Sequence, residues 1–381
     1  MDAWLKAQLG QLSAEALLRD PADADARRAL ASSGAPMLDA CSNDYLGLGR
    51  RAVSRETLSS LDGASIGAGA SRLVQGTFDE HSQLEQELAS WLGMPTSLLT
   101  LSAFAANVGL IPAVAGPGSL VVSDSLNHAS IVDGCRLAKA RVAIVPHLDV
   151  DAVERALAQH AGPGPAWVVT EGLFSMDGDS PDLAALRQVC DRFRAGLVVD
   201  EAHSLGVMGP SGSGRAAAER VHADVLVAGL GKAVGAQGGV VACSDAMRTW
   251  LWNRARSFVF STAPSPALCR LVLEQVRLAQ AADPLRAQLA VRARELRAAL
   301  SARGLTALGD PDSPIVPIVL GPNERALKAM EVLRARRILA QAIRPPTVPP
   351  GAARVRITVH ADWPEDAVAR IVEGLEVACA S

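Results

Sequence analysis

Apolar and polar positions follow different patterns in the two parts of the chain. Between residues 97 and 243, short and continuously apolar runs recur, which is typical of strands buried on both faces of a parallel sheet. Segments of helical periodicity, such as 151–160 and 182–193, separate most of these runs. We therefore predict an α/β fold whose mostly parallel sheet is flanked by helices. The predicted strands are 97–101, 119–123, 141–145, 166–170, 195–200, 224–229 and 238–243.

Beyond Pro266 the pattern changes to long helices and short strands, which indicates a smaller α+β region. We predict helical stretches at about 266–304, 323–337 and 364–378 and strands near 315–320 and 353–359. The first residues read as an amphipathic helix with interspersed charges, not as a signal peptide. The predicted parts are an N-terminal helical segment (1–44), a large domain (45–285) and a C-terminal small domain (286–381).

Composition narrows the class of protein. The 381 residues are 49% hydrophobic and 20% charged, enough apolar material for a full core. With 37 Lys and Arg against 40 Asp and Glu, the net charge of −3 suggests neither a nucleic acid nor a membrane surface as partner. Six scattered cysteines without a CxxC pair predict no disulfide framework and no metal site, as expected in the cytoplasm. Pro and Gly interrupt the uncharged stretch 88–123, so we predict no membrane span.

Lys232 is the first candidate for chemistry, because ligands of open α/β sheets bind at the carboxyl ends of strands. It follows the apolar run DVLVAG in the segment AGLGKAVGAQGG. A P-loop needs Ser or Thr after the lysine, but Ala233 stands there, and the glycine spacing is GxGxxxG instead of GxGxxG. Two interpretations stay open for this segment: a desolvated lysine that forms a Schiff base, or an ordinary loop lysine.

Asp200 ends the run AGLVVD, where a buried carboxylate needs a partner. A protonated pyridine nitrogen is one such partner, and a helix N-cap is the alternative. His203 could bond whatever Asp200 holds, and His128 could lie flat against an aromatic cofactor, although single histidines are more often structural. Glu201 is expected to be solvated. The remaining histidines are expected on surfaces: His81, His147, His160, His222 and His360.

The segment LSAFAAN (101–107) runs from a strand end into a helix whose first amides belong to Ala103 and Phe104. A helix N-terminus with small residues is suited to bind phosphate, although many strand–helix turns look alike. Ser175, in EGLFSMDGD, follows another strand and suits either a cofactor pocket or an ordinary turn.

Taken in order, these segments resemble the α-oxoamine synthases, a branch of the fold-type I pyridoxal 5′-phosphate (PLP) enzymes. The resemblance covers nearly the whole chain. Its motifs are CSNDYLGLG (41–49), GAGASRLVQG (67–76), LSAFAAN, NHAS, TEGLFSMDGD (170–179), VVDEAH, GLGKAVG, FSTAPSPA (260–267), IRPPTVPPG (343–351) and RVRITV (354–359).

The resemblance implies a role for each matching residue. Lys232 would bind the cofactor covalently, Asp200 would pair with its ring nitrogen, and His203 would bond its ring oxygen. His128 would stack on the ring, and Ser175 would line the pocket. The phosphate would be bound by the amides of Ala103 and Phe104 and by Thr262, which the neighbouring subunit would supply. For the substrates, Arg356 and Asn43 would bind the amino-acid carboxylate, and Thr347 and His128 would contact the substrate, with Arg19 the nearest basic candidate for the acyl part. Gly229 lies where most members carry Thr or Ser, and Ala103 where many carry Gly.

The Pro-rich segment IRPPTVPPG most resembles the family member of biotin biosynthesis. This implies a homodimeric, cytoplasmic acyltransferase that condenses L-alanine with a pimeloyl thioester of CoA or an acyl carrier protein. The alternatives are a sister enzyme that uses glycine or serine with another acyl-CoA, forming for example 2-amino-3-oxobutyrate or 5-aminolevulinate, and a catalytically silent partner subunit. The failed glycine spacing disfavours a nicotinamide-dependent dehydrogenase.

Overall fold

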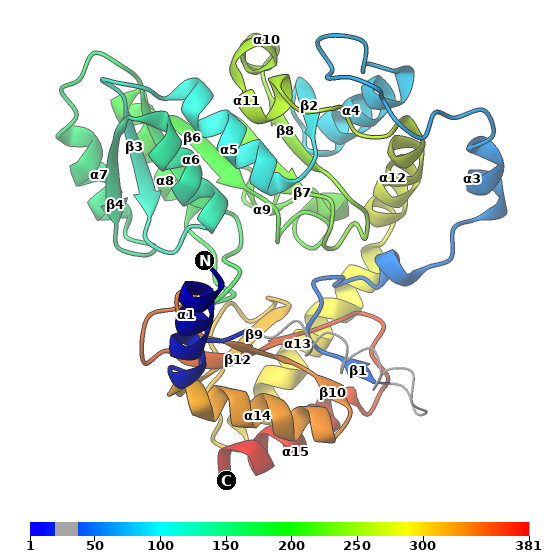
Figure 1. Ribbon diagram of the computed structural model, residues 1–381, viewed down its shortest axis with the longest axis vertical. Helices are drawn as coiled ribbons and strands as arrows, with labels where there is room; N and C mark the ends of the chain where they lie inside the picture. The colour runs from blue at the N-terminus through cyan, green and yellow to red at the C-terminus, as the bar shows by residue number, and fades with distance from the viewer. Residues whose placement is uncertain (20–36, 381) are drawn as a thin grey trace. The chain divides into compact units, whose positions relative to one another are not determined.

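The computed structural model describes residues 1–19 and 37–380, which form two compact units (Figure 1). The first, called the sheet unit here, consists of Asp44–Ser175 and Ser180–Arg286. The second, called the terminal unit, consists of Met1–Asn43, Met176–Asp179 and Ala287–Ser381. The N-terminal segment that the sequence pattern sets apart therefore shares a unit with the C-terminal residues.

The sheet unit contains a seven-stranded sheet of order β2-β8-β7-β6-β5-β3-β4. Every predicted strand is present, with ends that differ from the prediction by at most one residue. The five strands from β3 to β7 run parallel, whereas β8 is antiparallel to both of its neighbours. The strands are β2 (Thr96–Thr100), β3 (Leu120–Asp124), β4 (Arg141–Val145), β5 (Ala166–Glu171), β6 (Gly196–Asp200), β7 (Val225–Gly229) and β8 (Gly239–Cys243).

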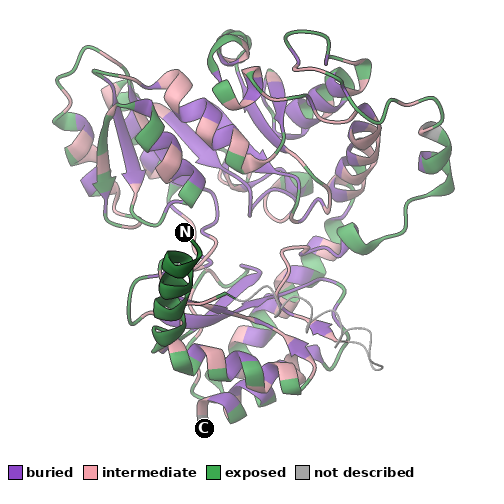
Figure 2. Ribbon diagram, in the orientation of Figure 1, coloured by how far each residue is buried: buried purple, intermediate pink, exposed green. Residues whose placement is uncertain are grey.

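Burial follows the position of each strand in the sheet (Figure 2). The central strands β7 and β8 are buried at every residue, as their unbroken apolar runs predict. For β4 the expectation of burial on both faces is wrong, since Ile144 is 73% exposed. This strand lies at the sheet edge with β3 as its neighbour, so its faces are less covered.

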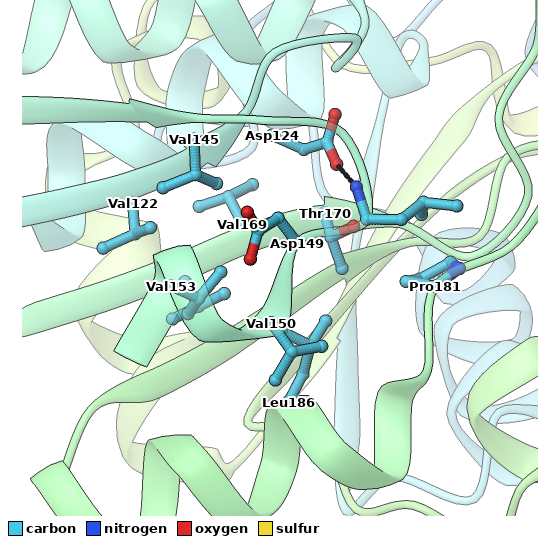
Figure 3. A pocket seen from close by; sticks show the side chains of 12 residues that line it. Val122, Asp124, Val145, Asp149, Val150, Val153, Val169, Thr170, Pro181 and Leu186 are labelled. Carbon is cyan, nitrogen blue, oxygen red and sulfur yellow. Dashed lines mark hydrogen bonds between the residues drawn. The ribbon is translucent and has the colours of Figure 1, made fainter. Parts of the chain in front are cut away.

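Helices cover both faces of the sheet. On one face, α5 and α6 pack through Leu110 and Ile131 against strand residues such as Val198 and Val227. On the other face, α7 and α8 enclose a mostly apolar cavity of about 20 Å³ (Figure 3). Such a space holds at most a single water, so this pocket is a packing gap rather than a ligand site. The helices are α5 (Ala103–Val114), α6 (Ala129–Ala138), α7 (Val150–Ala158) and α8 (Leu183–Phe193).

A buried ion pair fixes the part of the sheet unit beside β2. Arg72 donates two hydrogen bonds to Glu85, at 2.8 and 3.2 Å, and Arg248 lies 3.2 Å from the same carboxylate. Glu85 also accepts the Leu99 N–H at 2.9 Å, which ties the pair to the strand. The remaining helices of this unit are η1 (Leu48–Arg50), α3 (Arg55–Ser60), α4 (Asp79–Trp91), η2 (Pro210–Gly212), α9 (Arg215–Ala218), α10 (Asp245–Arg254), α11 (Arg256–Val259) and α12 (Pro266–Gln280).

The terminal unit is built on a three-stranded antiparallel sheet of order β11-β12-β9 and a short parallel pair, β1-β10. A helix is present at the predicted N-terminal position as α1, but none of its residues is buried, so the expected amphipathic character gives no buried face. Arg344 donates to the carbonyl groups of Ala16 and Leu18 just beyond it. The boundary between the units falls within α13. In the described ranges, no helix is both long and apolar enough for a membrane span. The elements are α1 (Asp2–Ala14), β1 (Leu38–Asp39), α13 (Asp283–Ser301), β9 (Ile315–Gly321), α14 (Asn323–Ala335), β10 (Ile338–Leu339), β11 (Gln341–Ile343), β12 (Ala353–Thr358) and α15 (Ala367–Ala380).

Candidate active site

Asp200 lies at the carboxyl end of β6 and is only 4% exposed. One carboxylate oxygen accepts the Ala202 N–H at 2.9 Å, and the other accepts Nδ2 of Asn107 at 2.6 Å. No α-helix begins directly after β6, so the alternative of a helix cap is wrong. The carboxylate is therefore held in the sheet unit by two donors, as an acceptor at a strand end.

His128 caps the N-terminus of α6 with its imidazole. The Ser130 N–H donates to His128 Nδ1 at 3.2 Å, and Oγ of Ser130 lies 2.8 Å from the same atom. A backbone N–H can only donate, so Nδ1 carries no proton and the ring proton is on Nε2. Burial lowers the pKa of His128, the Asp200 charge opposes this shift, and Lys232 adds to it. The ring is thus neutral, and Phe104 meets it edge-on at 6.3 Å between centroids.

Glu171 is a buried carboxylate that was not among the residues predicted from the sequence. It ends β5 directly opposite Asp200 in the strand register and accepts the His128 N–H at 2.6 Å. Burial and then the Asp200 charge raise the pKa of Glu171 to about 8, against the opposing effects of Lys232 and of the His128 N–H. The signal was present in the sequence, because Glu171 ends an apolar run just as Asp200 does.

Lys232 lies half-buried in the loop that joins β7 to β8. The loop is closed by hydrogen bonds from Leu230 N–H to the Gly238 carbonyl at 3.0 Å and from Gly235 N–H to the Lys232 carbonyl at 2.8 Å. The charge of Lys232 lowers the pKa of both His128 and Glu171. A strand, not a helix, follows the loop, which excludes the P-loop and the dinucleotide fingerprint.

The helix start for which we predict phosphate binding is the N-terminus of α5. Ser102 caps the helix, its Oγ accepting the Ala105 N–H at 3.1 Å, while the amides of Ala103 and Phe104 have no acceptor within the helix. Gly229 and Gly239, which are partners in the β7–β8 register, flank this helix end. A Cβ at Gly239 would come closer than 3.0 Å to the Ser102 backbone and to the Ala103 nitrogen, so only glycine fits there.

The turn after β6 is anchored by buried polar groups. The Tyr45 hydroxyl lies 2.6 Å from Nδ1 of His203, and both side chains are buried. The expectation that Glu201 is solvated is wrong, because it is fully buried. It accepts hydrogen bonds from the Ser204 hydroxyl and from the amides of Arg215, at 2.7 Å, and Ala216, at 2.8 Å. Burial raises the pKa of Glu201. The surface expectation also fails for His81 and His360, which are both buried.

The other predicted site residues are not all part of this cluster. Asn43 and Arg356 meet within the terminal unit, where an Nη of the buried Arg356 donates to Asn43 Oδ1 at 3.2 Å. In the same unit, Thr347 and Arg19 are exposed. Ser175 is half-buried in a turn after β5 of the sheet unit.

Thr262 is exposed at the rim of a cavity of about 300 Å³ in the sheet unit. The cavity is lined mainly by apolar side chains such as Leu84, Leu268 and Val272. No group of three or more His, Cys, Asp or Glu side chains in the described parts of the chain could hold a metal ion.

The sheet unit thus has the fold and the strand-end lysine and aspartate of fold-type I enzymes. Residues 35–375 match the model of the family aminotransferase class I and II, and the chain belongs to this family. It is 41% identical to 8-amino-7-oxononanoate synthase of Geobacter sulfurreducens over 97% of this chain and 96% of that protein. It is also 41% identical to the enzyme of the same name from Paracidovorax citrulli, over 90% of this chain and 85% of the other.

Solved structures agree with the sequence relatives. Serine palmitoyltransferase of S. paucimobilis, solved with a bound PLP–myriocin adduct, has a TM-score of 0.84 at 27% identity over 90% of this chain and 87% of that one. 8-Amino-7-oxononanoate synthase of Francisella tularensis has a TM-score of 0.77 at 26% identity, over 90% and 97%. Family membership and these structures indicate that the cofactor is pyridoxal 5′-phosphate.

The described residues fit this cofactor. Asp200 is a buried acceptor with no cationic partner among its hydrogen bonds, and a protonated pyridine nitrogen would supply one. The helix start at Ala103 offers amide donors to a phosphate, and Lys232 offers an amine. Gly229 provides no hydroxyl group, but a Cβ there would have ordinary contacts of 3.4 Å with Ala103 and 3.5 Å with Ala202.

Proposed function

We propose that the protein catalyses the decarboxylative condensation of L-alanine with a pimeloyl thioester, a step of biotin biosynthesis. The products are 8-amino-7-oxononanoate, CO2 and the free thiol. One observation carries the reaction class: the buried Asp200 carboxylate at the end of β6 is held by the Asn107 amide and the Ala202 N–H, and the charges of Asp200 and Lys232 both act on the pKa of His128. The substrates follow from relatives named 8-amino-7-oxononanoate synthase, which match almost the whole chain.

Each residue of the sheet unit has a proposed task. When bound, pyridoxal phosphate supplies an electron sink for negative charge on the substrate Cα. Lys232 would hold the cofactor, and its Nζ would move the Cα proton of the substrate. Asp200 accepts the N–H of the cofactor ring. His203 bonds the ring oxygen and is itself held by Tyr45. The other proposed cofactor contacts are the amides of Ala103 and Phe104, Ser175, the strand end at Gly229, and Thr262 of a second subunit.

The neutral His128 suits two tasks. Its flat face can stack on the cofactor ring, and its Nε2–H is free of the bonds that occupy Nδ1. That proton can donate to the thioester carbonyl oxygen as negative charge develops on it during attack by Cα. If His128 were protonated, its positive charge would compete with the nitrogen of the cofactor ring for the Asp200 carboxylate. Burial lowers the pKa of His128 and so keeps the imidazole neutral.

The substrate contacts belong mainly to the terminal unit. We assign the alanine carboxylate to Arg356, whose guanidinium can bind a carboxylate in bidentate fashion, with Asn43 orienting it. Thr347 and Arg19 are the proposed contacts of the acyl substrate. The proposed assembly is a homodimer, and the acyl donor is either CoA or an acyl carrier protein.

The test is thiol release by the PLP-loaded protein with alanine, glycine or serine crossed with pimeloyl-, acetyl-, succinyl- or palmitoyl-CoA. Release confined to alanine and pimeloyl-CoA supports the proposal. Release with serine and palmitoyl-CoA would overturn the substrate assignment and favour a sister enzyme, which the fold likeness to serine palmitoyltransferase makes the second candidate.

A separate test concerns the lysine. The chain has only four lysines, Lys6, Lys139, Lys232 and Lys328, so borohydride reduction of the holoenzyme followed by peptide mapping identifies the cofactor's attachment site directly. We expect the reduced cofactor on Lys232 alone. Lys232→Ala should abolish both attachment and turnover, whereas Lys328→Ala, on the exposed surface of α14, should change neither. Attachment to any other lysine would refute the assigned role.

A further inference from the structure

A polar side chain interrupts the apolar helix α5 at a buried position. Asn107 is 0% exposed within the segment AFAANVGLIPAV. Its Nδ2 donates to Asp200 Oδ2 at 2.6 Å and to Ser130 Oγ at 3.0 Å, while no described residue donates to its Oδ1. With the amide reversed, an oxygen would face the Asp200 carboxylate, so this carboxylate dictates the orientation of the amide.

Ser130 continues the chain of hydrogen bonds to His128. Its Oγ lies 2.8 Å from His128 Nδ1, and because Nδ1 already accepts the Ser130 N–H, the hydroxyl proton must point to the ring. The Ser130 oxygen in turn accepts from Asn107. One buried amide therefore donates in two directions, to Asp200 and, through Ser130, toward His128.

We propose that Asn107 and Ser130 are positioning residues, which together hold the Asp200 carboxylate and the Nε2–H form of His128 in the arrangement that the reaction requires. The inference rests on the proposed function, in which Asp200 and His128 act on cofactor and substrate. Neither Asn107 nor Ser130 touches a reacting atom. Their effect is to couple two groups on different elements, β6 and α6, through one side chain of α5.

The charged surroundings make this arrangement sensitive to any added carboxylate. The charge of Asp200 already acts on Glu171 of the neighbouring strand, on His128 and on Glu201 beside it. Lys232 acts on the first two. A carboxylate at position 107 would stand at hydrogen-bond distance from Asp200, and two carboxylates so close share one proton. Protonated, the new side chain can still donate to Asp200; ionised, it cannot.

Asn107→Asp is therefore an isosteric variant whose defect depends on pH. We expect its kcat, divided by that of the wild type at each pH, to fall about tenfold or more between about pH 6 and pH 9. Taking this ratio removes the titration of Glu171, which both proteins share. The absorption band of the bound cofactor should shift over the same pH range in the variant only. This second measurement does not depend on turnover.

Two alanine substitutions test separately the hydrogen bond from Asn107 to Asp200 and the hydrogen bond from Ser130 to His128. Asn107→Ala removes a hydrogen bond to a charged group, so we expect kcat to fall about 10- to 100-fold at every pH. Ser130→Ala removes two neutral hydrogen bonds, one to His128 and one from Asn107, and should cost about 3- to 10-fold. If they form one network, the double variant loses less than the product of the two. Ser97→Ala is the matched control, since Ser97 is 1% exposed like Ser130 but donates to the Glu85 carbonyl.

The outcomes separate the inference from the proposed function. If the wild type releases no thiol with any substrate pair while the cofactor band of Asn107→Asp still titrates, the proposed reaction is wrong and the positioning network stands. If Asn107→Asp follows the wild-type pH profile and spectrum, and Asn107→Ala and Ser130→Ala multiply as independent changes, the network is refuted. Thermal unfolding of each variant shows whether the protein compared is folded. If Asn107→Asp does not fold, Asn107→Ala replaces it in the comparison.

Discussion

Replacing Gly239 by alanine will move the start of α5 and weaken cofactor binding. A Cβ at this position meets backbone atoms of Ser102 and Ala103 well inside 3.0 Å, and backbone cannot rotate away as a flexible side chain can. Relief requires the helix start to shift by about 1 Å, with an overpacking cost of about 1–3 kcal/mol in the free energy of unfolding. Because an amide–phosphate hydrogen bond contributes about 1.5–3 kcal/mol, losing one should raise the Kd for pyridoxal phosphate about 10- to 100-fold.

Gly229 provides the matched control for this prediction. It is the register partner of Gly239, yet a Cβ there has ordinary contacts of 3.4 and 3.5 Å. Gly229→Ala should therefore change the Kd by less than about threefold, since it removes no contact and strains no backbone. The assay is titration of apoprotein with pyridoxal phosphate, followed by absorbance, with thermal unfolding of the same samples. If Gly239→Ala binds the cofactor as tightly as the wild type, or if Gly229→Ala loses as much, the geometric argument is refuted.

Three further predictions concern single side chains. Gly229→Ser adds a hydroxyl where a Cβ has room, and should lower the Kd for pyridoxal phosphate about tenfold; an unchanged or higher Kd would contradict a phosphate contact at this position. The raised pKa of Glu171, about 8, means that the folded apoprotein holds a proton that the unfolded chain loses above its ordinary pKa near 4.5. Between these two pKa values, the free energy of unfolding should thus fall by up to about 1.4 kcal/mol for each unit of rising pH. Glu171→Gln should make this fall less steep when unfolding by urea is measured at several pH values. An equal slope in both proteins would disprove the raised pKa of Glu171. Arg72→Met leaves the buried Glu85 with a single cationic neighbour and should cost about 3–5 kcal/mol in urea unfolding, whereas a cost below about 1 kcal/mol would show that the pair is not needed.

The sequence pattern predicted the sheet well because burial in a parallel sheet leaves a local trace. Runs such as 195–200 and 224–229 are apolar at every position, and the strands start and end within one residue of them. Edge position leaves no such trace. The run RVAIV is as apolar as its neighbours, yet β4 is largely exposed because chain topology, which is non-local, puts it beside β3 alone.

The sequence singled out candidate site residues where a side chain ends or follows an apolar run, as Asp200 and Lys232 do. Residues that support these two were missed, since their partners are distant in sequence. Asn107 reaches Asp200 across 93 positions, and Glu171 receives the His128 N–H across 43. The error at Glu201 has the same origin, because its anchors at Arg215 and Ala216 belong to a later turn.

The pairing of β2 with β8 has a consequence for how the protein is made. Thr100 faces Gly239 in this register, so the first strand of the sheet waits for the last one before it can pair. At about 5–20 residues per second, synthesis of the intervening chain takes on the order of ten seconds. During that interval β2 has no strand to pair with, and the start of α5 lacks the strand that packs against it. The nascent chain thus completes its sheet only after β8 has left the ribosome, and the unpaired β2 is the segment that a chaperone would have to shield.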